Sequence, residues 1–218
     1  MWMVVLAAGN GSRLRQETGG APKQLVEIDG RTLLDKLLEL GRLLQLAPLV
    51  VTRPAHAARF RRPGVEVLTA VETPDMLATL WSARRRVEED FLWVGGDTLL
   101  TDPEPIRALL RRHLAERPYA SFLYRRSARH LAKLALASPV PRVVLTREGS
   151  FPYSLPNFGI QSAASFADLA VEPRGEYVQR ALDRAERITF CEYAAPVFEI
   201  DTAEDLEAAR RHYRCSTC

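Results

Sequence analysis

Two glycines, two arginines and a lysine follow the first apolar segment of the chain. The segment "MWMVVLAAG" leads into Gly9, Gly11, Arg13 and Arg15, and Lys23 comes ten residues after Arg13, directly behind a proline. Glycine lets backbone amides approach an anion closely, and arginine can bind phosphate through two parallel hydrogen bonds. The spacing therefore predicts a loop that holds phosphate groups.

Two familiar phosphate loops do not match this stretch. A dinucleotide-binding GxGxxG needs a third glycine where Leu14 stands, and no segment fits the Walker A pattern GxxxxGK[ST]. Two interpretations stay open on these residues alone: a phosphate loop of another kind with a distant lysine, or a turn with solvated arginines.

Two aspartates stand at the ends of apolar segments. Asp97 closes "FLWVGGD", and Asp201 follows Ile200 at the start of "DTAEDLEAAR". Carboxylates on rigid strand ends are typical ligands of Mg²⁺. Asp97 could also be a turn residue or a helix cap, and Asp201 or Thr202 could cap the next helix with Asp205 completing a capping box.

The first half of the chain alternates strand and helix patterns. This order predicts a mostly parallel sheet with helices on both faces, and ligands bind beyond the carboxyl ends of such strands. The predicted strands are 3–8, 48–52, 65–69 and 90–97, and the predicted helices are 31–46, 73–87 and 102–117.

The second half begins with closely spaced strand patterns between residues 118 and 165, which indicate an antiparallel excursion. A helix over 176–185, a strand over 187–195 and a closing helix over 202–213 follow. We expect one Rossmann-like α/β domain over 1–218 with a small β insert.

The composition is that of an ordinary globular protein, with 218 residues, 47% hydrophobic residues and a net charge of +3. No general nucleic-acid binder is indicated. No apolar run approaches the ~20 residues that span a bilayer, and the first segment lacks a basic n-region, so we expect a cytoplasmic protein without a membrane partner. Cys191, Cys215 and Cys218 indicate neither a disulfide scaffold nor a zinc site. The sequence leaves the oligomeric state open.

"LAAGNGSRL", followed by "PKQLVEIDGRTLLDKLLE", resembles the LAAGxGxRL…PK signature of nucleotidyltransferases that activate sugar-1-phosphates and related phosphomonoesters, MobA-like NTP transferases among them. The resemblance implies the GT-A-like fold of that family, with Arg13 and Lys23 as catalytic cations that neutralise a triphosphate. It implies that 1–117 binds the nucleotide and 118–218 the acceptor. The implied triphosphate loop consists of Leu6, Ala7, Ala8, Gly9, Asn10, Gly11 and Ser12.

The same resemblance implies that Asp97 and Asp201 share one Mg²⁺, with Glu199 as a possible helper. It assigns Thr79 and Ser82, which lie three apart on one predicted helix, to the base and ribose, although both could be ordinary helix residues. The implied acceptor contacts are Asn157, Gly159 and Glu176. The four histidines, which are His56, His113, His130 and His212, are expected at the surface.

The implied reaction joins an NTP to a phosphomonoester and releases pyrophosphate. CTP, dTTP, UTP and GTP are all candidate donors, and a sugar-1-phosphate is the first candidate acceptor. Alternatives are an alcohol phosphate such as phosphocholine or inositol phosphate, or the molybdenum cofactor. A silent nucleotide-binding sensor is the non-enzymatic alternative.

Overall fold

A computed structural model describes most of the chain. The described residues are 1–9, 11–14, 17–70, 76–126, 135–136, 145–146, 153–168 and 187–216. The helix predicted over 176–185 lies outside these ranges.

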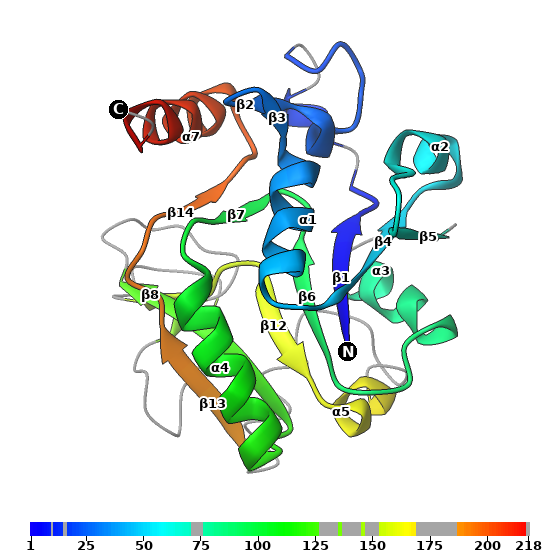
Figure 1. Cartoon of the computed structure of the whole chain (residues 1–218), viewed down its shortest axis with the longest axis vertical. Coiled ribbons are helices and arrows are strands. Elements are labelled where there is room, and N and C mark those ends of the chain that lie inside the picture. Colours follow the sequence, from blue (N-terminus) through cyan, green and yellow to red (C-terminus); the bar gives the residue numbers. More distant parts are fainter. Residues whose placement is uncertain are drawn as a thin grey trace.

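Four parallel strands form the first half of the sheet (Figure 1). The central strand β1 (Trp2–Ala7) pairs with β4 (Ala47–Thr52) on one side and with β6 (Phe91–Gly95) on the other, and β5 (Glu66–Thr69) extends the sheet beyond β4. Their apolar runs are covered on both faces, as expected for a parallel sheet. The predicted parallel half is confirmed.

The sheet continues beyond β6 with reversed strands. β12 (Phe158–Gln161) is antiparallel to β6, and β8 (Ala120–Arg126) is antiparallel to β12. β13 (Ile188–Glu192) is parallel to β8. Two reversals restore the direction of β6, so β8 and β13 end at the same edge as β1, β4 and β6.

A short antiparallel ladder extends the sheet from β8. It agrees with the antiparallel strands predicted for this part of the chain. β11 (Tyr153–Ser154) pairs with β8 and with β9 (Ala135–Leu136), which pairs with β10 (Leu145–Thr146). The first strand of the excursion nevertheless belongs to the main sheet, because β8 pairs with β12 and β13 inside it.

Helices cover both faces of the sheet. One face is packed by α1 (Leu33–Leu43) and α4 (Pro103–Glu116), whose apolar residues form one core with Met3 and Val5 of β1. Thr32 caps α1, because its Oγ1 accepts a hydrogen bond from the amide of Asp35.

The opposite face carries α3 (Met76–Ser82) and α5 (Ala163–Asp168), which pack with Val4 and Leu6 of the same strand. Alternate residues of β1 therefore enter two different cores. The described part of the predicted helix 73–87 consists of α3 and the 3-10 turn η4 (Ala83–Arg85).

A third core joins the two ends of the chain. The C-terminal helix α7 (Ala203–Ser216) places Leu206 and Ala209 in one cluster with Leu14 and Ile28. Figure 1 shows α7 beside β2 and β3, and Arg210 Nε donates to the carbonyl of Glu27 at 3.2 Å. Residues distant in sequence thereby meet above the carboxyl edge of the sheet.

Short elements complete the described fold. They are β2 (Glu27–Ile28), β3 (Arg31–Thr32), β7 (Thr98–Leu100), β14 (Val197–Glu199), α2 (Ala57–Phe60), and the 3-10 turns η1 (Ser12–Leu14), η2 (Lys23–Leu25) and η3 (Pro54–His56). β7 pairs with β14, and β2 pairs with β3. Within the described ranges, no helix is long and apolar enough to cross a membrane.

Among the described histidines, His113 contradicts the predicted surface position, and His130 lies outside the described residues. His113 is fully buried in α4, and its Nδ1 lies 2.8 Å from Oγ of Ser121. Its Nε2 lies 3.6 Å from a carboxylate oxygen of Asp90, and burial lowers the pKa of the imidazole. Ser121, His113 and Asp90 are the residue types of a Ser-His-Asp catalytic triad. Ser121 is fully buried too, however, so a substrate cannot reach it.

Gly159 offers a test of the packing between β12 and β6. A Cβ atom at Gly159 would lie 2.7 Å from Nε1 and 2.9 Å from Cε2 of the Trp93 ring. Gly159→Ala should therefore lower the free energy of unfolding by about 1–3 kcal/mol through overpacking. Urea denaturation measures it, with Gly9→Ala as the matched control, because a Cβ there meets nothing within 4 Å. Equal stability of the two variants would contradict this packing.

Candidate active site

The side chain of Lys23 joins two aspartates that are far apart in the sequence. Its Nζ donates to Oδ2 of Asp97 at 2.7 Å and to Oδ1 of Asp201 at 2.8 Å. The side chains are 10% exposed for Lys23 and 15% for each aspartate. Arg13, which is 63% exposed, adds a contact of 3.1 Å to Oδ2 of Asp201. The two carboxylates and two cations are formally balanced in charge.

Lys23 is positioned by a rigid turn. Pro22 precedes it in extended backbone, and the turn η2 is closed by the bonds from the amide of Leu25 to the carbonyl of Pro22 and from Val26 to Lys23. Burial alone would lower the pKa of Lys23, but the carboxylates of Asp97 and Asp201 outweigh it and raise the pKa above its ordinary value. The ammonium group therefore stays protonated at neutral pH.

The two glycines before Asp97 bring the end of β6 against β1. The amide of Gly96 donates to the carbonyl of Leu6 at 2.8 Å, and a Cβ at Gly96 would lie 2.7 Å from that oxygen. At Gly95 a Cβ would lie 2.7 Å from Oδ1 of Asp97 itself. Only glycine leaves room for this close approach, which the sequence shows as "GGD".

Thr202 caps α7, the helix that follows, and the carboxylate of Asp201 contacts Lys23 and Arg13. Oγ1 of Thr202 accepts from the amide of Asp205, and Oδ2 of Asp205 accepts from the amides of Thr202 and Asp201. This reciprocal arrangement settles the choice that the sequence left open. The amide of Ile200 donates to the carbonyl of Asp97 at 2.8 Å, which holds the backbones of the two aspartate segments together.

The glycine loop leaves β1 at the same edge. Leu6, Ala7 and Ala8 are buried, and Gly11 adopts a φ of 57°, a conformation that favours glycine. Asn10 and the side chain of Ser12 lie outside what the structure describes.

Two residues at the end of β4 also hold this loop, and the sequence analysis missed both. Oγ1 of the buried Thr52 donates to the carbonyl of Ala7 at 3.1 Å, and Nε of Arg53 donates to the carbonyl of Ala8 at 2.7 Å. The available signal was their position, because they end the second parallel strand, next to β1 at the ligand-binding edge.

The three residues predicted to bind the acceptor lie in different places. Asn157 lies beside the cluster: its carbonyl accepts from the amide of Gly95 at 2.7 Å, and its amide donates to Oε1 of Glu199 at 3.3 Å. Gly159 is buried in β12 against the Trp93 ring, so its lack of a side chain already has a packing reason. Glu176 lies outside the described residues.

The two base and ribose candidates both lie on α3. Thr79 is buried, and Ser82 is half-buried with its hydroxyl donating to the carbonyl of Ala78 at 3.1 Å. The hydroxyl of Ser82 is therefore engaged by its own helix, and its predicted contact with a nucleotide stays a prediction.

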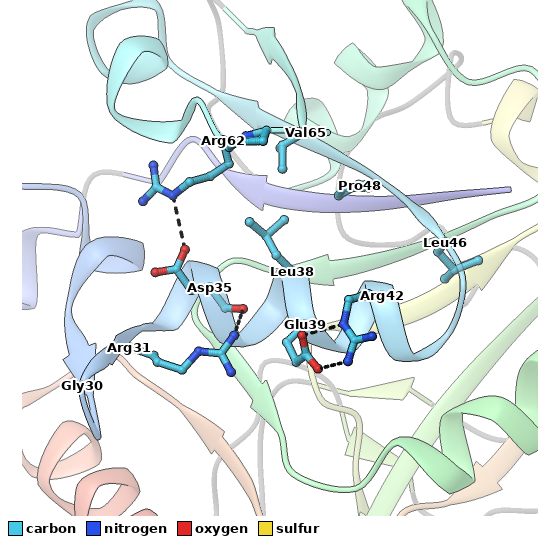
Figure 2. A pocket seen from close by; sticks show the side chains of 11 residues that line it. Gly30, Arg31, Asp35, Leu38, Glu39, Arg42, Leu46, Pro48, Arg62 and Val65 are labelled. Carbon is cyan, nitrogen blue, oxygen red and sulfur yellow. Dashed lines mark hydrogen bonds and ion pairs between the residues drawn. The ribbon is translucent and has the colours of Figure 1, made fainter.

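A separate hollow of about 550 Å³ lies along α1, with neither Asp97 nor Asp201 among its lining residues, and Figure 2 shows that lining. Its charged groups pair with one another: Arg62 Nε lies 3.3 Å from Asp35, Arg42 binds Glu39, and Arg31 donates to the carbonyl of Asp35. The side chains of the Arg42–Glu39 and Arg62–Asp35 pairs are 32 to 70% exposed, whereas those of Lys23 and its two aspartates are 10 to 15% exposed and lie at the carboxyl edge of the parallel strands, where ligands bind. We therefore place the candidate active site at Lys23.

The fold defines a class. The mostly parallel α/β sheet with helices on both faces matches the fold of nucleotidyltransferase structures. The chain belongs to the family of MobA-like NTP transferase domains, whose family model matches residues 3–152.

Individual proteins of known name share only limited sequence identity with the chain. Over 131 residues the chain is 28% identical to the UTP–glucose-1-phosphate uridylyltransferase AglF of Haloferax volcanii, a match that covers 56% of this chain and 53% of AglF. The chain thus spans about half the length of that relative.

Two solved structures share the fold over nearly the whole chain. An apo UDP-glucose pyrophosphorylase has a TM-score of 0.84 at 11% identity, with 100% of both chains covered. The inositol-1-phosphate CTP transferase of T. maritima has a TM-score of 0.77 at 17% identity, covering 95% of this chain and 94% of that one.

The convergence of Lys23 and Asp97 can be tested without any substrate. Lys23→Met leaves two carboxylates facing each other without their shared cation, and should destabilise the protein by about 3 kcal/mol. Asp97→Asn in the same chain should recover part of this loss, with a coupling energy of about 0.5–3 kcal/mol in a double-mutant cycle. Urea denaturation of the four proteins gives the coupling, and strictly additive losses would show that the two side chains do not interact.

Proposed function

We propose that this protein transfers a nucleotidyl group from an NTP to a phosphomonoester and releases pyrophosphate. The observation that carries the proposal is the buried contact of Lys23 with Asp97 and Asp201 beside the glycine loop. Family membership supports the reaction class. The acceptor class is supported by the names of the similar proteins, which include a glucose-1-phosphate uridylyltransferase and an inositol-1-phosphate CTP transferase.

In this proposal each group has a separate task. The amides of Gly9 and Gly11 orient the triphosphate, Arg13 faces its outer phosphates, and Lys23 stabilises negative charge at the α-phosphate. The second half of the chain, with Asn157, binds the acceptor. The acceptor's own phosphate oxygen attacks the α-phosphorus, and a phosphate monoester has a second pKa near 6, so that this oxygen is already ionised at neutral pH. The reaction therefore needs positioning and charge neutralisation rather than a general base.

We further propose that Asp97 and Asp201 hold Mg²⁺ together with the phosphates. The donor set fits, because both carboxylates already contact one cation, the ammonium group of Lys23, at 2.7 and 2.8 Å. Among the described residues no cluster of three or more acidic, histidine or cysteine ligands exists, and Mg²⁺ typically binds one or two carboxylates with substrate phosphates completing its shell. The ion would neutralise phosphate charge there.

A matrix of donors and acceptors tests the activity. CTP, UTP, dTTP, GTP and ATP are each combined with sugar-1-phosphates, inositol phosphate and phosphocholine in Mg²⁺, and pyrophosphate release is measured. At least one pair should react, and Lys23→Ala should lower its kcat by about 10²–10³, the usual loss for one electrostatic stabiliser. Arg59→Ala, which removes an exposed cation on α2, should leave kcat unchanged.

The result separates the possible functions. Pyrophosphate release with a sugar-1-phosphate as acceptor would favour a sugar-nucleotide enzyme, and release with inositol phosphate or phosphocholine would favour an alcohol phosphate enzyme. Nucleotide binding without pyrophosphate from any pair would favour the silent sensor over the proposed enzyme.

The metal proposal predicts competition between Lys23 and a divalent ion. Without nucleotide, the ammonium group contacts both carboxylates and should keep Mn²⁺ binding weak. Lys23→Met should strengthen nucleotide-free Mn²⁺ binding at least about tenfold, because removing one adjacent positive charge relieves a repulsion of several kcal/mol. Electron paramagnetic resonance of free Mn²⁺ measures this, with Arg59→Met as the control. Equal Mn²⁺ affinity in the wild type and in Lys23→Met would argue against a shared position.

A further inference from the structure

Arg53 lies at the carboxyl end of β4, directly beside the glycine loop. The strand order β6-β1-β4 places the segments after β6 and β4 on the two sides of the loop that follows β1. Asp97 follows β6 on one side, and Arg53 follows β4 on the other. The loop therefore has Asp97, with its ion pair to Lys23, on one side and Arg53 on the opposite side.

The contact of Arg53 with the loop is short and specific. Nε of Arg53 donates to the carbonyl of Ala8 at 2.7 Å, within the range of charge-assisted hydrogen bonds. Arg53 is only half-buried, and its backbone is extended (φ −75°, ψ 149°), as expected for a residue before a proline, here Pro54. Pro54 thus restrains the backbone from which the guanidinium group reaches the loop.

This hydrogen bond determines the direction of the next amide. In a planar trans peptide the carbonyl of one residue and the N–H of the following residue point in opposite directions. Because the carbonyl of Ala8 points to Arg53, the N–H of Gly9 points away from Arg53. Thr52 orients the preceding amide in the same way: its hydroxyl donates to the carbonyl of Ala7 at 3.1 Å and thereby fixes the direction of the N–H of Ala8.

The chemical difference between Thr52 and Arg53 is informative. A neutral hydroxyl is sufficient to hold the carbonyl of Ala7, whereas the carbonyl of Ala8 is held by a cation. A guanidinium group has five N–H donors, and the bond to Ala8 uses one of them. A permanent positive charge at this edge favours an anion next to the loop as well as the loop's own conformation.

We propose that Arg53 is a positioning residue for the polyphosphate of the nucleotide: it holds Ala8 so that the amide of Gly9 faces the phosphates, and it adds positive charge beside them. This inference rests on the proposed function, because it assigns a role within the same nucleotide site. It predicts that the contribution of Arg53 grows with the number of phosphates on the ligand.

Three substitutions separate the hydrogen bond from the charge. Arg53→Met removes both, Arg53→Gln keeps a neutral donor, and Arg53→Lys keeps a charge. Arg59→Met, on the exposed surface of α2, is the matched control. Isothermal titration calorimetry in Mg²⁺ with CTP, UTP, dTTP and GTP, and with the di- and monophosphates of the base that binds, measures the affinities. Thermal unfolding of each variant reports its stability.

We expect Arg53→Met to weaken triphosphate binding about 10- to 100-fold, the usual loss for a hydrogen bond from a charged group. Monophosphate affinity should change less than about threefold, and Arg53→Lys and Arg53→Gln should lie between Arg53→Met and the wild type. A merely structural role would weaken tri- and monophosphate equally.

Several results would overturn the inference. Triphosphate affinity within about twofold of the wild type in Arg53→Met would do so, as would equal losses for mono- and triphosphate in the variants that fold. If Arg53→Met does not fold, Arg53→Gln and Arg53→Lys carry the same comparison. A wild-type chain that binds none of the nucleotides would instead refute the proposed function, and this inference with it.

Discussion

The site depends on one electrostatic constraint: a buried ammonium group needs carboxylates, and two aspartates this close together need a cation. Lys23 satisfies both requirements with contacts of 2.7 and 2.8 Å to Asp97 and Asp201. Without Lys23, the two carboxylates would face each other in a poorly solvated position with only the exposed Arg13 as a cation. The constraint therefore ties the beginning, the middle and the end of the chain to one point above the sheet.

Other parts of the fold hold Lys23, Asp97 and Asp201 close together. The glycines before Asp97 let β6 end against β1, and the capping box at Thr202 leaves the carboxylate of Asp201 for Lys23. The third core holds α7 against the segment that carries Lys23, and Lys36 Nζ over the Tyr213 ring, at 3.7 Å, adds a contact between α1 and α7. A site built on strand ends and a capped helix is pre-organised before any ligand binds.

Much of the fold could be predicted because its signals are local. The apolar runs of β1 and β4 and the helical spacing of α1 depend on neighbouring residues, and the structure agrees with them within a few residues. The burial of His113 was missed because its neighbours in sequence are Arg-rich, although its spacing from Ile106, Leu109 and Leu110 places it on the apolar face of α4. β8 looked like the start of an insert, because strand patterns do not specify which strand they pair with.

The sequence by itself determined the kinds of residue at the site: the glycine loop, the lysine behind a proline, and two aspartates after apolar strands. Local chemistry and spacing carry that information. Only the tertiary structure decided that Asp201 contacts Lys23 while Thr202 caps the helix, and that Arg53 holds the carbonyl of Ala8. The contact of Asp201 with Lys23 joins segments 178 residues apart and that of Arg53 with Ala8 joins segments 45 residues apart, and such pairings arise from sheet order and core packing rather than from neighbouring residues.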